Sequence, residues 1–143
     1  MKVFQVTLGV SNSPDYVAGD VIDGVVTLTE FGAGGIRLLR SITAKEPGGG
    51  TPALKLLFFR DAPSGGTYQD NAALAWGSGD MANLIGVVTV AASDWVTLAS
   101  KSVVSLGGID QGHEAESGSI SLIVVADATF NASADITLEI AYD

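Results

Sequence analysis

The feature that most restricts the fold of this chain is the placement of apolar residues at every second position, in short runs. In the run 134–142, Ile136, Leu138 and Ile140 share one face, whereas Thr137 and Glu139 share the other. A period of two residues is typical of a β-strand with one buried and one wetted face. Runs of this kind are separated by Gly, Pro, Asn and Asp, which favour turns. The pattern therefore predicts an all-β fold.

Nine segments carry the strand pattern, at residues 3–10, 24–31, 36–46, 53–60, 85–91, 95–100, 102–106, 119–126 and 134–142. Two of them, 53–60 and 119–126, are apolar on both faces. Such a segment is either a central strand of a sandwich or a strand whose outer face meets another subunit. The pattern favours the central strand and leaves the subunit contact open.

One short helix is expected within residues 78–86, where Ser78 or Asp80 would cap its start and Gly86 would end it. The glycine-rich stretch 46–52 is short enough to be a hairpin loop, and it does not resemble a linker between domains. Together these elements predict a jelly-roll-like β-sandwich with one short helix, formed as a single domain over residues 1–143.

The composition excludes several functional classes. Only 16% of the residues are charged, against roughly 25% in a typical soluble domain, so the surface is either covered by partners or simply neutral. Seven basic and 16 acidic residues give a net charge of −9, which argues against nucleic acid as a partner. There is no cysteine for a disulfide or a thiolate metal site. No apolar run is long enough for a membrane span, and the first residues lack the apolar core of a signal peptide. We therefore expect a protein made in a cytoplasm, with no membrane partner.

Residues with catalytic or metal-binding chemistry are sparse. His113, the one histidine, lies among acids in the stretch 110–117, and we interpret this stretch as a solvated loop; metal ligation by His113 is the weaker alternative. Neither a G-x-S-x-G elbow nor a phosphate-binding glycine loop is present. Carboxylates in turns are the remaining candidates for hydrolysis or weak calcium binding, and these are Asp15, Asp20, Asp23, Asp61 and Asp70. We predict that the protein is not an enzyme, and we assign no catalytic, cofactor or metal residue.

The two tryptophans offer a different kind of site. Trp95 begins a predicted strand and is expected to anchor the core or pack at a corner. Trp76 follows a tract of small residues, and it would be the better platform for stacking on a sugar. A glycan-binding module that uses Trp76 or the loop around His113 is therefore an alternative function.

Four segments resemble, in their order, a family of small virion structural proteins of tailed bacteriophages. They are YVAGDVIDGVVTLTE, LKLLFFRDAPSGGTYQDNAAL, DMANLIGVVTVAASDW and SADITLEIAYD, and together they span most of the chain. The shared motifs are a Y-x-x-G-D-x-I-x-G opening, an apolar strand ending in FF before a Pro-Ser/Thr-Gly-Thr turn, a D-N-A-A step, and a short helix before I-G-V-V. The acidic stretch DQGHEAES departs from the family pattern, in which a neutral or basic stretch is expected.

The resemblance implies a structural role and supplies no catalytic residue. Proteins of this kind are associated with the capsid exterior as decoration or cement subunits, typically as trimers on the major capsid lattice. We therefore expect a homotrimer that binds the major capsid protein and stabilises the capsid. The alternative is a module of the tail or fibre that binds a host glycan.

Overall fold

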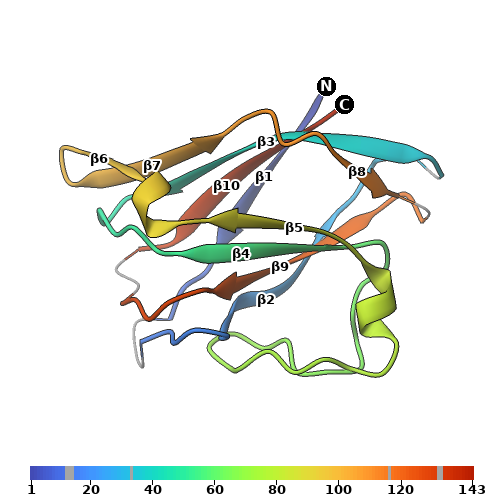
Figure 1. Cartoon of the computed structure of the whole chain (residues 1–143), viewed down its shortest axis with the longest axis horizontal. Coiled ribbons are helices and arrows are strands. Elements are labelled where there is room, and N and C mark those ends of the chain that lie inside the picture. Colours follow the sequence, from blue (N-terminus) through green and yellow to red (C-terminus); the bar gives the residue numbers. More distant parts are fainter. Residues whose placement is uncertain (12–14, 33, 116, 132–133) are drawn as a thin grey trace.

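The chain forms two antiparallel β-sheets packed face to face (Figure 1). The computed structural model describes residues 1–11, 15–32, 34–115, 117–131 and 134–143. The larger sheet has the strand order β1-β10-β3-β7-β6, and β8 extends it by pairing with β3 beside β7. Its strands are β1 (Lys2–Leu8), β3 (Ile36–Glu46), β6 (Val96–Leu98), β7 (Lys101–Leu106), β8 (Gln111–Glu114) and β10 (Ile136–Tyr142). The smaller sheet has the order β2-β9-β4-β5, with β2 (Val21–Leu28), β4 (Leu54–Phe59), β5 (Leu84–Val90) and β9 (Ile120–Ala126).

The pairing of the strands is nested along the chain. β1 pairs with β10, β2 with β9, β3 with β7 and β8, and β4 with β5, all in antiparallel register. The chain therefore behaves as one long hairpin, folded over so that successive pairs fall alternately in the larger and the smaller sheet. The tip of this hairpin is the connection 60–83, which joins β4 to β5.

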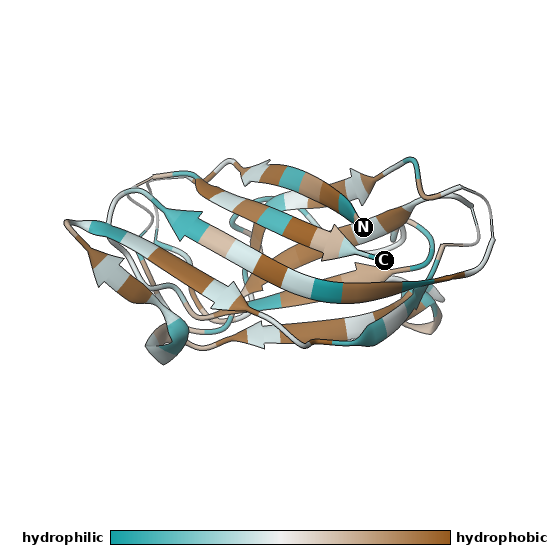
Figure 2. Cartoon of the chain, turned by 90° about the horizontal axis from the view of Figure 1, so that it is seen from above, coloured by the Kyte–Doolittle hydropathy of each residue, from teal (hydrophilic) through white to brown (hydrophobic). Residues whose placement is uncertain are grey.

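The core lies between the two sheets because each strand turns every second side chain inward. Figure 2 shows the resulting alternation of hydrophilic and hydrophobic residues along the strands. In β10, Ile136, Leu138 and Ile140 are buried, while Thr137 and Glu139 are only half-buried. The prediction of an all-β fold is confirmed, and Ile136, Leu138 and Ile140 share the buried face as expected, whereas Ala141, expected on the wetted face, is also buried.

The two segments that are apolar on both faces are central strands of the smaller sheet. β9 lies between β2 and β4, and β4 lies between β9 and β5. Their second apolar face packs under the connection 60–79, in a cluster that includes Leu57, Phe59, Tyr68 and Ile123. This connection continues the backbone pairing, since the Val21 amide donates to the Ala72 carbonyl oxygen at 2.9 Å. Most of the outer face of these strands is thus covered by the chain itself, and Lys55 on β4 stays exposed.

Several details differ from the sequence predictions. The expected helix is a single 3₁₀ turn, η1 (Asp80–Asn83), preceded by Gly79 at φ 83° without a side-chain cap. Gly86 lies inside β5 because the strand begins directly after that turn. The stretch 46–52 is no hairpin loop, because β3 and β4 belong to different sheets. A second 3₁₀ turn, η2 (Ala92–Asp94), and strand β8 were not predicted. None of the helices in the described part of the chain is long and apolar enough to cross a membrane.

Candidate functional site

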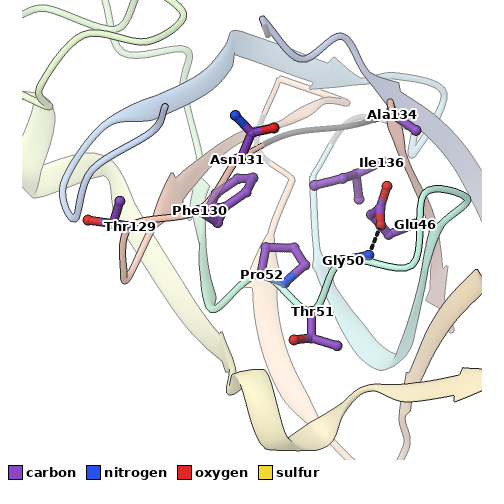
Figure 3. Close-up of a pocket in the computed structure, with 9 residues that line it drawn as sticks. All are labelled: Glu46, Gly50, Thr51, Pro52, Thr129, Phe130, Asn131, Ala134 and Ile136. Atoms are coloured by element: carbon purple, nitrogen blue, oxygen red, sulfur yellow. Dashed lines mark hydrogen bonds between the residues drawn. The ribbon is translucent and has the colours of Figure 1, made fainter. Parts of the chain in front are cut away.

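A pocket of about 200 Å³ opens at one end of the sandwich, between the β3–β4 and β9–β10 connections (Figure 3). The strand order places these two connections together, because β3 and β10 are neighbours in one sheet and β4 and β9 are neighbours in the other. The pocket combines one carboxylate, polar side chains and apolar walls, and it is lined by Glu46, Gly50, Thr51, Pro52, Thr129, Phe130, Asn131, Ala134 and Ile136.

Glu46 is the charged residue of this pocket, and it is held in place by the glycine-rich turn that follows it. As the last residue of β3, it continues the inward-facing series of Ile42 and Ala44, and only 4% of it is exposed. One carboxylate oxygen accepts a hydrogen bond from the Gly48 amide at 2.9 Å, and the other accepts one from the Gly50 amide. A carboxylate at an inward-facing position of a predicted strand is the sequence signal for this site, which was not among the predicted sites.

The opposite wall is built on an aromatic pair. Phe130 stacks on the buried Tyr16, with ring centroids 5.1 Å apart and planes at 15°. The Tyr16 hydroxyl donates to Asp70 at 2.6 Å, so the tip connection fixes this pair from outside. The side-chain amide of Asn131 donates to Asp15 at 2.5 Å. Phe130 and Asn131 therefore enter the pocket wall from a segment anchored at two points.

Three of the five carboxylates predicted as candidates accept hydrogen bonds, namely Asp15, Asp20 and Asp70. Asp70 accepts from the Asp23 amide at 2.8 Å as well as from Tyr16, and Asp20 accepts from the Val17 amide at 2.9 Å. Asp61 is exposed, at the start of the tip connection. In the described ranges, no group of three or more His, Asp or Glu side chains is placed to hold a metal ion.

His113 lies in the core, so its interpretation as part of a solvated loop is wrong. It belongs to β8 and is fully buried, with its Nδ1 2.8 Å from the Tyr142 hydroxyl oxygen. Its ring packs on Phe58 with centroids 4.7 Å apart, and its Nε2 lies 3.3 Å from the side-chain oxygen of Gln111. Burial lowers the pKa of His113 to about 4 and raises the pKa of Tyr142. A glycan outside the protein therefore has no access to this histidine.

A second buried polar pair fastens the tip connection. The Tyr68 hydroxyl donates to Asp80 at 2.6 Å, and the Gly65 amide donates to the same oxygen at 2.9 Å. The Tyr68 hydrogen bond lowers the pKa of Asp80, and burial raises the pKa of Tyr68. Asp80 thus joins the two ends of a connection that the sequence showed only as a tract of small residues.

The tryptophans have different environments. Trp95 is buried, and its indole nitrogen donates to the Pro52 carbonyl oxygen at 2.8 Å, which confirms the predicted core anchor. Trp76 is 39% exposed and borders a groove of about 260 Å³ on the outer face of the smaller sheet. The rim of this groove carries the ion pair between Lys55 and Asp127, whose atoms are 3.1 Å apart.

The larger sheet ends in an edge strand with exposed apolar side chains. All three residues of β6 are exposed, including Val96 at 57% and Leu98 at 65%. Thr97 points inward, since its hydroxyl lies 2.9 Å from that of the buried Ser102. Val96 and Leu98 therefore project from the outer face of the sheet.

No protein-family model matches this chain, and a search of curated proteins gives no match either. The resemblance drawn from the sequence motifs therefore stays a prediction.

Proposed function

We propose that this protein is a capsid decoration or cement protein of a tailed bacteriophage, assembled as a homotrimer on the major capsid protein. The order of the sequence motifs supports this proposal, and so does the exposed apolar edge at β6. A cement subunit acts through the surface that it buries across joints of the lattice, and such a surface needs apolar side chains with few charges. The proposed location is the exterior of the virion.

The nested strand pairing supports the finer proposal that the sandwich is a jelly roll. A jelly roll has two four-stranded sheets and arises when a long hairpin is wrapped so that its pairs alternate between the sheets. The pairs β1–β10 and β3–β7 in one sheet, and β2–β9 and β4–β5 in the other, have this arrangement. Strand β6 then lies outside the wrapped hairpin, as an added edge on the larger sheet.

The observation that carries the assembly proposal is the character of β6. Edge strands present unpaired backbone groups, and proteins normally protect them with charged side chains or proline. β6 instead presents Val96 and Leu98, and among the described residues it pairs only with β7. An exposed edge with apolar side chains is suited to a contact with another subunit.

The oligomeric state and capsid binding test this proposal. We expect light scattering to give a trimer, and purified subunits to bind capsids that lack them. Val96→Asp places a charge in the contact and should give monomers that bind capsids weakly. Val87→Asp is the matched control, because Val87 is an exposed valine (39%) on β5, the edge strand of the other sheet. A monomeric unaltered protein that leaves capsids unbound contradicts the proposal.

A glycan-binding module of the tail or fibre is the second candidate function, and the groove beside Trp76 supports it. An aromatic face next to polar groups is a common way to hold a sugar ring, and this groove has Trp76 beside Lys55 and Asp127. Glycan-array binding that Trp76→Ala abolishes would favour this function. Glycan binding that Trp76→Ala leaves unchanged would contradict this second function and favour the assembly proposal.

A further inference from the structure

The pocket at the end of the sandwich holds a buried anion without a cationic partner. Glu46 takes part in none of the ion pairs found among the described residues, and the other residues that line the pocket are uncharged. Lys45 and Lys101 line a neighbouring hollow together with Glu46, but Lys45 pairs with Glu139 and Lys101 donates to the Pro47 carbonyl oxygen at 3.5 Å. Burying a charge is costly unless it is paired, so this carboxylate would gain from a cation.

The size and the walls of the pocket restrict what this cation can be. A volume of about 200 Å³ is below the roughly 300–1,000 Å³ of small-molecule sites, and is suited to one side chain. Pro52, Phe130 and Ile136 form apolar walls beside the carboxylate. Such walls would cover the methylene stem of a long basic side chain, whose charged end would then reach Glu46. Tyr16 stacks on Phe130, which fixes the position of this ring in the pocket wall.

The hydrogen bonds of Glu46 favour an ammonium group over a guanidinium group. Arginine binds a carboxylate best as a fork that takes both oxygens, whereas lysine carries a compact charge with rotatable donors. Each oxygen of Glu46 already accepts one backbone amide, from Gly48 or Gly50. A single ammonium can use a remaining lone pair and can donate to the Thr51 hydroxyl, which also lines the pocket.

We propose that this pocket binds the lysine side chain of a partner protein, with Glu46 as the counter-ion. The strong negative charge of the chain, −9, would also attract a basic segment from a distance. The identity of the partner, the capsid lattice, rests on the proposed function. The binding of a lysine side chain to the pocket does not.

The direct test uses Nα-acetyl-lysine methylamide as the probe, titrated into the purified protein. Amide chemical shifts of Gly48, Gly50 and Thr51 should move and saturate. The same compound acetylated on its side-chain nitrogen has no charge and should leave these shifts unchanged. Equal responses to both compounds, or no response to either, overturn the proposal.

Two variants and a control show whether the pocket is responsible. Glu46→Gln removes the charge but keeps an acceptor, and it should weaken binding of the lysine probe by about tenfold or more. Thr51→Trp leaves Glu46 in place and fills the entrance of the pocket from an exposed position, so it should abolish binding of the lysine probe. This variant tests the pocket independently if Glu46→Gln folds poorly. Glu139→Gln, on the outer face of β10, removes a carboxylate that pairs with Lys45 and should leave binding within about twofold. Unchanged binding in both pocket variants contradicts the assignment.

Capsid binding by the same variants separates the two proposals. If Glu46→Gln loses both the lysine probe and the capsid, the pocket is the capsid contact. If the lysine probe binds but the unaltered protein leaves capsids unbound, the capsid function fails and the lysine pocket stands.

Discussion

Mild acid should destabilise this protein through His113. The ring is fully buried, its hydrogen-bonding neighbours are the neutral side chains of Tyr142 and Gln111, and its cross-strand partner on β3 is Arg37. Burial lowers the pKa of the folded state to about 4, whereas an unfolded chain has a histidine pKa near 6.5. Well above pH 6.5 the His113 ring is neutral in both the folded and the unfolded state, so it does not lower the free energy of unfolding. As the pH falls below 6.5, only the unfolded state gains a proton, so the free energy of unfolding decreases.

The difference between these two pKa values corresponds to a decrease of about 3 kcal/mol in the free energy of unfolding. This decrease is reached once the pH falls below about 4. At pH 4.5 most of that loss, about 2.5 kcal/mol, should already be present. This is a large share of the roughly 5–15 kcal/mol that stabilises a typical domain. Carboxylates such as Asp80, whose pKa is lowered by Tyr68, add a further acid-dependent loss of stability. The contribution of the histidine therefore has to be measured as a difference between two proteins.

Urea unfolding followed by tryptophan fluorescence, at several pH values from 7.5 to 4.5, gives that difference. His113→Gln keeps a hydrogen-bonding group for Tyr142 and cannot titrate, so its stability should decrease less on acidification, by about 2.5 kcal/mol at pH 4.5. Since the chain has one histidine, its ring proton signals in NMR report the folded pKa directly, even if the variant is unstable. Parallel pH profiles for the two proteins, or a ring that titrates near pH 6.5 in the folded state, would refute the reasoning.

Two further substitutions test the buried contacts. Tyr68→Phe removes a donor to Asp80 and should cost about 1–3 kcal/mol in urea unfolding, with faster proteolysis in the tip connection; an unchanged midpoint would contradict the role of this pair. Gly86→Ala would place a methyl carbon about 2.3 Å from Nε2 of His113 and should lower stability by about 1–3 kcal/mol, as measured by thermal unfolding. Gly107→Ala is the control, because the added carbon meets nothing within 4 Å. An equal loss of stability in both variants would contradict the role of packing against His113.

Alternation of apolar residues was enough to predict most strands. The predicted strand 36–46 coincides with β3, and its inward positions Ile42, Ala44 and Glu46 follow the two-residue period. Strand β8 was not predicted because its inward side chains, Gln111 and His113, are polar. They meet their hydrogen-bond partners only in the folded sandwich. Such partners come from other strands and leave no local signal in the sequence.

The pocket could not be predicted from the sequence for a similar reason. Glu46 and Phe130 are 84 positions apart in the chain, and only the neighbouring positions of β3 and β10 bring their connections together. The cover over β4 and β9 also depends on a distant connection, whose Tyr68 is bound by Asp80. The sequence therefore predicted which strands are central, but not what lies on their outer face.

The nested pairing sets the order in which the molecule can be completed during synthesis. β4 and β5 are close in sequence and can pair early, whereas β1 has no strand to pair with until residues 136–142 have emerged from the ribosome. Pairings between distant segments close long loops and fold slowly. The first strand made is therefore the last to find its place, and its amide groups should be among the last to gain protection from hydrogen exchange.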